Sequence, residues 1–291
     1  VINFYKLGQT SRVNAIVGQC TVDPHEVDGP NKHLLVTHQL LRHTDKPNMS
    51  WPVATIGENE KVFKMIEMVM GEGYLASHYF VTASVCALSP LQYAQESADT
   101  IIAYARANQP VTVLTAPMTG VSTPISDIGA LVAQNAELLA GIVLAQLVQP
   151  GVPVIYGTAT YAADMRSGAF ITGSPLSNLI DRAALQLAQS LYHVPTRTLA
   201  GNTDAKVPDI QAGYETMQNY IQLLMGGTHM INECLGILDG MMTVSYEKYI
   251  IDEEMLRRVG CMMRGLDTSE ASFDMGVLLE TPHMEPFLMH E

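Results

Sequence analysis

The stretch from Thr112 to Gly157 constrains the fold of this chain more than any other. An apolar run rich in Val and Thr ends in a loop at Thr115–Gly120, a long apolar helical stretch follows, and a second apolar run closes at Gly157. Short β-branched runs bounded by Gly or Pro are typical of strands. A strand, a helix and a second strand in this order favour a parallel sheet with right-handed crossovers.

The same alternation recurs along the chain. Seven candidate strands are Ile2–Lys6, Asn48–Val53, Tyr79–Cys86, Val111–Ala116, Pro153–Thr158, Pro195–Gly201 and Thr228–Glu233. Helices are predicted at residues 30–43, 58–70, 90–108, 128–149, 175–192, 209–225 and 247–265. Seven such units are nearly the eight of a closed α/β barrel. A doubly wound sheet is disfavoured, because its phosphate-binding motifs GxGxxG and GxxxxGK[ST] are missing. We therefore predict an α/β fold, a TIM (β/α)8 barrel incomplete at its N-terminal side, in a single domain over residues 1–291.

The composition disfavours two classes of partner. The net charge is −13, only 15% of the residues are charged, and no cluster of basic side chains occurs. Nucleic acids and anionic membranes are bound mainly through Lys and Arg, so we expect no nucleic acid and no membrane among the partners. Residues 128–149 are long enough to span a bilayer but include Gln134 and Glu137. Because polar groups are costly in lipid, we predict a buried barrel helix there.

Cysteine usage indicates the compartment. Cys20, Cys86, Cys234 and Cys261 lie far apart and form no CxxC pair. This spacing disfavours a disulfide framework and favours a reducing compartment. No signal peptide is evident, so we expect a cytoplasmic protein. The chain begins without Met inside an apolar run, from which we expect a fragment of a longer enzyme.

Candidate site residues follow from the predicted topology. In a parallel barrel the active site lies at the C-terminal ends of the strands, where the βα loops converge. The residues at that level form neither a GxSxG elbow nor an HExxH zinc signature, so we name no catalytic residue and expect no metal bound directly by the chain. The substrate-binding candidates are Trp51, Thr115, Tyr156, Asn202, Lys206 and Glu233.

Several residues at this level have a second interpretation. Tyr156 could equally be a packed aromatic at the end of its strand, and Glu233 could cap the segment that follows it. Lys206 could pair with Asp204 on the same loop, and exposed pairs of this kind contribute little to stability. Cys86 is more typical of a core side chain than of a ligand.

Three segments also resemble a known family. They are Thr112–Gly157, Asn202–Glu215 and Gly236–Glu247, and the chain is similar to the trimethylamine methyltransferase (MttB-like) family from about Asn3 to Phe287. The resemblance implies a TIM barrel. It further implies transfer of a methyl group from a small methylated amine to the Co(I) of a corrinoid (cobalamin), which is carried on a separate corrinoid protein. The chain could also form a homo-oligomer.

Two departures from the family pattern refine this expectation. Founding members carry pyrrolysine, which would fall around Leu199–Asn202, whereas this sequence has standard residues there. The chain therefore resembles the branch that lacks pyrrolysine, whose members act on quaternary amines such as glycine betaine. Relatives often carry Glu at the position of Leu176. Any role of that Glu in the family is therefore not expected in this chain.

The predicted chemistry needs binding and orientation and no acid–base pair, because the corrinoid supplies the nucleophile. Tyr156 and Trp51 could hold a permanent cation by their π faces, with Glu233 adding charge. A betaine carboxylate would need Lys206, Asn202 or backbone N–H groups. Demethylation of trimethylamine, another TIM-barrel activity such as a lyase or an aldolase with a Lys206 Schiff base, and a non-catalytic fragment remain alternatives.

Overall fold

The computed structural model describes residues 1–18, 22–27, 29–50, 53 and 55–289. Its centre is a curled sheet of seven strands in the order β1-β2-β3-β4-β6-β9-β10, and every neighbouring pair is parallel. The strands are β1 (Val17–Gly18), β2 (Asn48–Met49), β3 (Val81–Cys86), β4 (Val111–Thr115), β6 (Val154–Thr158), β9 (Thr196–Leu199) and β10 (Met230–Asn232).

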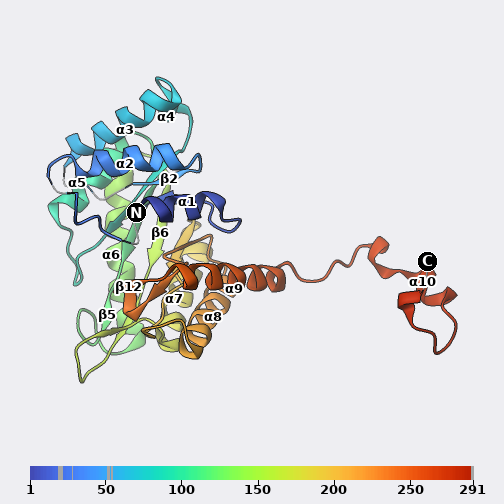
Figure 1. Ribbon diagram of the computed structural model, residues 1–291. Coiled ribbons are helices and arrows are strands. Elements are labelled where there is room, and N and C mark those ends of the chain that lie inside the picture. Colours follow the sequence, from blue (N-terminus) through green and yellow to red (C-terminus); the bar gives the residue numbers. More distant parts are fainter. Residues whose placement is uncertain (19–21, 28, 51–52, 54, 290–291) are drawn as a thin grey trace.

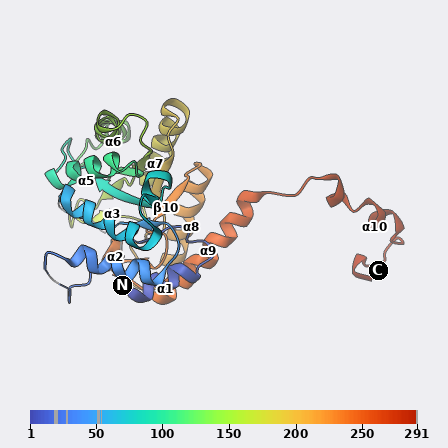
Figure 2. The same ribbon diagram turned by 90° about the horizontal axis from the view of Figure 1, so that it is seen from above.

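Helices cover the outer side of this sheet (Figures 1 and 2). They are α1 (Ile2–Thr10), α2 (Lys32–His43), α3 (Ile56–Met70), α4 (Tyr74–Ser77), α5 (Gln95–Arg106), α6 (Asp127–Val148), α7 (Pro175–Leu187), α8 (Ile210–Met225) and α9 (Tyr246–Arg264). The short strands β5 (Met118–Thr119), β7 (Tyr161–Ala163) and β8 (Phe170–Ile171) form a second sheet, and β11 (Ile237–Leu238) pairs with β12 (Thr243–Val244). The predicted α/β alternation is confirmed from β2 to α9.

The first predicted strand is wrong. Residues 2–6 belong to α1, and the first strand of the sheet is β1, which begins at Val17. Tyr5 and Gly8 are the buried residues of α1, and this spacing of three places both on one helical face. Tyr5 packs against Val36 and Leu40 of α2. No edge of the sheet therefore lies at Ile2–Lys6, and the strand at this end of the sheet is β1.

One predicted helix boundary is corrected by a buried carboxylate. The helix expected from residue 90 begins at Gln95, because the preceding residues are held in a turn. Glu137 of α6 accepts hydrogen bonds from the Ser89 hydroxyl at 2.7 Å and from the backbone N–H of Leu91 at 2.8 Å. A local sequence signal at Pro90 gives no information about this distant partner.

The main core lies between the sheet and its outer helices. Val113 of β4, Leu138 of α6 and Ala184 of α7 belong to it, and all three are fully buried. Burial of a Val or Leu side chain contributes about 1.5–3 kcal/mol. Helix α6 is apolar and long enough to cross a membrane by length and composition. Its polar Gln134 and Glu137 are buried toward the sheet, as expected for a barrel helix.

Beyond α9 the chain leaves the body of the molecule. Residues 265–289 extend away from the sheet and include the short helix α10 (Met275–Glu280) (Figures 1 and 2). Nearly all of their side chains are exposed. This segment therefore adds nothing to the core that positions the site.

Candidate functional site

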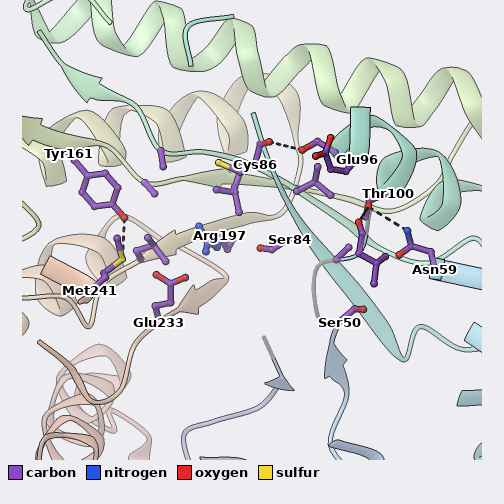
Figure 3. A pocket seen from close by; sticks show the side chains of 18 residues that line it. Ser50, Asn59, Ser84, Cys86, Glu96, Thr100, Tyr161, Arg197, Glu233 and Met241 are labelled. Carbon is purple, nitrogen blue, oxygen red and sulfur yellow. Dashed lines mark hydrogen bonds between the residues drawn. The ribbon is translucent and has the colours of Figure 1, made fainter. Parts of the chain in front are cut away.

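A cavity of about 390 Å³ lies at the C-terminal ends of the barrel strands (Figure 3). This is within the range of small-molecule sites, about 300–1,000 Å³. Its position agrees with the rule for parallel barrels. The polar, charged and thiol side chains that line it belong to Ser50, Asn59, Ser84, Cys86, Glu96, Ser97, Thr100, Tyr161, Arg197 and Glu233.

Two adjacent strands supply two of the three charged residues that line the cavity, and the third is Glu96 of α5. Arg197 lies within β9, and Glu233 directly follows β10. These strands pair in parallel, with Met230 opposite Arg197 and Asn232 opposite Leu199. Glu233 therefore lies nearer to the mouth than the backbone of Arg197. Its backbone is left-handed, with φ of 48°, so it leaves the extended path of the strand.

Two nitrogen atoms of the Arg197 guanidinium are buried without a hydrogen-bond partner among the described residues. The residue is only 1% exposed, and its Nε and Nη1 atoms make no hydrogen bond within the described chain. Burial lowers the pKa of Arg197, and the charge of Glu233 opposes this shift. Burial likewise raises the pKa of Glu233, and Arg197 opposes that shift. The two groups thus share an electrostatic environment, although the described residues include no ion pair between them.

Strands β3, β4 and β6 contribute several small side chains to the cavity lining. Ser84 and Cys86 come from β3, while Ala116 and Ala159 follow β4 and β6. The Oγ atom of Ser84 is buried without a hydrogen-bond partner in the part of the chain that is described. Burial raises the pKa of the Cys86 thiol, so this group is neutral near pH 7. Cys86 nevertheless retains solvent exposure, so the cavity is accessible from outside.

The aromatic side chain of Tyr161 also borders the cavity. Its hydroxyl group donates a hydrogen bond to Sδ of Met241 at 3.6 Å, and its ring lies 5.3 Å from that of Phe170. Burial raises the pKa of Tyr161, so the phenol stays protonated. Tyr161 belongs to the short second sheet, which the sequence pattern did not reveal.

Tyr156 and Thr115 do not join Glu233 at the mouth, and this predicted grouping is wrong. Tyr156 is fully buried, and its hydroxyl donates to Oδ1 of Asn135 in α6 at 3.0 Å. The hydroxyl of Thr115 donates to Glu137 of the same helix. Because side chains alternate across a strand, both residues face the helices, while their neighbours face the barrel interior.

The three remaining candidates have other environments. Asn202 is 3% exposed, and its backbone carbonyl accepts a hydrogen bond from Asn219 at 3.0 Å. The Lys206 side chain is 78% exposed and pairs with Asp239, which excludes the alternative pairing with Asp204. Neither Asn202 nor Lys206 lines the described cavity. Trp51 lies outside the described residues. Glu233 is thus the predicted candidate that the structure brings to the cavity.

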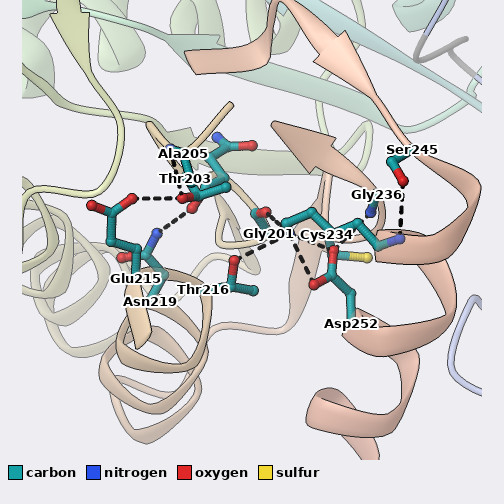
Figure 4. Close-up of polar contacts among 12 residues, drawn as sticks. Gly201, Thr203, Ala205, Glu215, Thr216, Asn219, Cys234, Gly236, Ser245 and Asp252 are labelled. Atoms are coloured by element: carbon teal, nitrogen blue, oxygen red, sulfur yellow. Dashed lines mark hydrogen bonds and ion pairs between the residues drawn. The ribbon is translucent and has the colours of Figure 1, made fainter. Parts of the chain in front are cut away.

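Asp204 instead supports the loop after β8. Its carboxylate accepts hydrogen bonds from the backbone N–H groups of Thr172 at 2.8 Å and Gly173 at 3.1 Å. Glu215 of α8 in turn accepts from the hydroxyl of Thr203 at 2.6 Å and from the backbone N–H of Asp204 at 2.9 Å (Figure 4). The segment Asn202–Glu215 therefore builds the support of the site.

A buried ion pair holds the segments that follow β9 and β10. Lys248 of α9 is 1% exposed, and its Nζ atom donates to the carbonyl of Gly201 at 3.1 Å, to Oγ1 of Thr216 at 3.1 Å and to Oδ2 of Asp252 at 2.6 Å. Asp252 also accepts from the backbone N–H of Gly236 at 2.7 Å (Figure 4). Gly201 is required here, because a Cβ would lie 2.3 Å from the carbonyl carbon of Cys234. The network fixes the backbone beside Arg197 and Glu233.

Sequence reasoning missed Arg197, although a signal was present. Arg is almost never fully buried unless it is paired, and here it interrupts a run of Thr, Leu and Ala in a predicted barrel strand. The Lys248–Asp252 pair has the i, i+4 spacing of a helical face. In the described chain no group of three His, Cys, Asp or Glu side chains is arranged to hold a metal ion.

The chain is similar in sequence to curated methyltransferases. The chain is 34% identical over 277 residues to the proline betaine:corrinoid methyltransferase of Eubacterium limosum, covering 93% of this chain and 57% of that protein. It is 34% identical over 274 residues to the glycine betaine methyltransferase of Desulfitobacterium hafniense (strain Y51), covering 94% and 57%. The chain thus spans little more than half the length of these curated relatives.

A solved structure supports the fold. The monomethylamine methyltransferase MtmB of Methanosarcina barkeri matches with a TM-score of 0.61 at 9% identity, over 91% of this chain and 56% of that one. At this identity the likeness concerns the fold alone. The family described as Trimethylamine methyltransferase (MTTB) matches residues 1–291. The chain therefore belongs to the trimethylamine methyltransferase family.

Proposed function

We propose that the protein containing this chain transfers a methyl group from a quaternary amine, glycine betaine or a close analogue, to the Co(I) of a corrinoid held by a partner protein. Family membership supports the reaction class. The observation that carries the substrate class is the carboxylate of Glu233, which borders a partly enclosed cavity near its mouth. A permanent cation is a natural counter-ion for this carboxylate, because burial penalises its charge and Arg197 offsets that penalty only in part.

The reaction requires little chemistry from this chain. The corrinoid on its partner protein would supply the nucleophile that takes the methyl group. The carbon–nitrogen bond breaks, its electron pair stays on nitrogen, and the amine leaves as a tertiary amine without a proton transfer. The residues of the chain bind the ammonium, orient one methyl group outward and exclude water. This role agrees with a cavity in which Cys86 and Tyr161 are both neutral.

Leu199 supports a quaternary substrate over trimethylamine. Pyrrolysine would fall around Leu199–Asn202 by the resemblance described above, and Leu199 lines the cavity. A leucine side chain cannot activate a neutral tertiary amine. A quaternary amine needs no activation, because it releases a neutral tertiary amine when it loses a methyl group. Tyr161 is the described aromatic side chain best placed to face the cation, a role that the sequence suggested for Tyr156 and Trp51.

The wider setting follows from the same proposal. The seven described strands would form part of an eight-stranded barrel whose remainder lies on the N-terminal side. The protein would act in the cytoplasm, where reduced corrinoid proteins operate. The lyase and aldolase alternatives receive little support, because Lys206 pairs with Asp239 and lies outside the cavity lining.

The experiment is methyl transfer by the full-length protein to a reduced corrinoid protein, followed through the cobalt spectrum. We expect methylation with glycine betaine or a related quaternary amine and none with trimethylamine. Glu233→Gln should reduce transfer by at least tenfold, while the control Glu254→Gln on the exposed face of α9 should not. Transfer from trimethylamine alone would overturn the substrate class, and transfer from no methylated amine would overturn the reaction.

A further inference from the structure

The cavity contains a cationic side chain, Arg197, that the proposed function does not use. Arg197 is almost fully buried in its wall, and two of its nitrogen atoms have no acceptor among the described residues. A buried charge without a partner costs several kcal/mol in a folded protein. The charge of Glu233 offsets part of this cost, but it supplies no hydrogen bond, so the free N–H groups of Arg197 can receive a further anion.

The shape of the group indicates which anion. A guanidinium presents a planar set of N–H donors that matches a carboxylate or a phosphate with two parallel hydrogen bonds. Glu233 lies in the same cavity and raises the cost of a second negative charge. A phosphate dianion would meet this repulsion with twice the charge of a carboxylate. The cavity therefore favours a carboxylate, and favours it most when the same molecule carries a positive charge toward Glu233.

The register of the strands orients such a molecule. Leu199 of β9 is opposite Asn232 of β10, so Glu233 lies about three residues closer to the mouth than Arg197. At about 3.3 Å per residue along a strand, the offset between the two backbones is roughly 10 Å. A bound zwitterion would have its carboxylate deep at Arg197 and its ammonium near the mouth. The methyl groups would then face the side from which a partner protein can approach.

We propose that Arg197 binds the carboxylate of the substrate, and that this subsite restricts the enzyme to zwitterionic amines. The inference rests on the proposed function for the identity of the cationic half. It replaces Lys206 and Asn202 as carboxylate ligands. Lys206 is exposed and paired with Asp239, and Asn202 lies outside the cavity lining.

The test is equilibrium binding by calorimetry to the full-length protein without corrinoid. Glycine betaine is compared with choline, which keeps the trimethylammonium group but replaces the carboxylate with a hydroxymethyl group. The wild-type protein should bind glycine betaine about 10- to 100-fold more tightly than choline, the effect expected for hydrogen bonds to a charged group. Arg197→Gln should reduce this preference to within about threefold, and Arg197→Lys should restore part of it.

Lys206→Gln is the matched control, because it removes the other cation that the sequence offered as a carboxylate ligand. It should keep the wild-type preference. The ratio of the two affinities is measured within each variant, so a partly unfolded population does not change it. Equal wild-type affinity for the two ligands, no measurable binding of glycine betaine, or an unchanged preference in Arg197→Gln would overturn the subsite.

The outcomes also separate this inference from the proposed function. If the preference depends on Arg197 but no methyl group reaches the corrinoid, the subsite stands and the reaction fails. If methyl transfer proceeds but the preference survives in Arg197→Gln, the reaction stands and the subsite fails.

Discussion

Two buried basic side chains of the barrel differ in what surrounds them. Lys248 and Arg197 are each 1% exposed. The ammonium of Lys248 has acceptors from Gly201, Thr216 and Asp252. Two guanidinium nitrogens of Arg197 have none in the described chain.

The contrast separates a structural charge from a functional one. A buried charge with a full set of hydrogen bonds can stabilise a fold, whereas an unpartnered one lowers its stability. Lys248 connects the segments after β9 and β10. Arg197 faces the cavity that these segments border. The support is satisfied internally, whereas the unpartnered nitrogens of Arg197 are the basis of the proposed carboxylate subsite.

The largest expected effect is the loss of the buried pair. Lys248→Met should lower the free energy of unfolding by about 3–5 kcal/mol, because it leaves the buried carboxylate of Asp252 unpaired. Urea unfolding followed by circular dichroism measures this change. The double variant Lys248→Met/Asp252→Leu should recover most of the loss. A loss below 1 kcal/mol in the single variant would contradict the structural role.

A third buried side chain, Asp181, tests whether a few hydrogen bonds offset the full cost of burying a carboxylate. Asp181 accepts a hydrogen bond from the backbone N–H of Thr160 at 3.0 Å and another from the hydroxyl of Thr158, but burial still raises its pKa from 3.8 to about 6. Between these values the folded chain binds this proton more strongly than the unfolded chain, so stability falls as pH rises from about 4 to 6. The contribution is about 3 kcal/mol at 1.36 kcal/mol per pKa unit.

Asp181→Asn isolates this contribution. Between pH 4 and pH 7 the free energy of unfolding of the wild type should fall by about 3 kcal/mol more than that of the variant. Unfolding in urea at both pH values measures it. Identical pH dependence in the two proteins would show that the carboxyl titrates normally in the fold.

Arg197 should respond in the opposite sense to Lys248. Arg197→Met removes an unpartnered buried charge, so the free energy of unfolding of the ligand-free protein should rise by about 1–3 kcal/mol. The same urea experiment measures the change. Glycine betaine at one fixed concentration should stabilise the wild type more than the variant. A marked loss of stability in the ligand-free variant would place Arg197 among the structural charges.

The smallest effect is expected at an exposed pair of the same spacing. Glu254 and Arg258 are four residues apart on α9, as Lys248 and Asp252 are, but both are mostly exposed. Arg258→Ala should cost only about 0.3–0.5 kcal/mol. A cost comparable to that of Lys248→Met would mean that burial does not account for the difference.

The sequence predicted the order of elements better than the direction of side chains. Strands at 81–86, 111–115 and 154–158 were found within two residues, because short β-branched runs alternate with long helical ones. Residues 2–6 were misassigned, since a short apolar run fits a strand and a helix equally well. The strand at 17–18 is too short to produce any periodicity.

The candidate site required information that local sequence does not carry. The rule that active sites lie at strand ends identified the level of Thr115 and Tyr156, but a register error of one residue turns a side chain to the opposite face. Glu233 reaches the cavity after its backbone leaves the strand in a left-handed conformation. Arg197 was overlooked because it lies inside a strand and not at its end.

The origin of Arg197 and Glu233 on other strands than the two alanines of the cavity has a consequence for the range of amines that the proposed site could accept. Arg197 and Glu233 come from β9 and β10, whereas Ala116 and Ala159 follow β4 and β6. Replacing an alanine changes the volume and shape available to a substituent on the nitrogen without removing either charge. On the proposed function, such a replacement would change which amines fit the cavity while Arg197 and Glu233 keep both charges for a zwitterion.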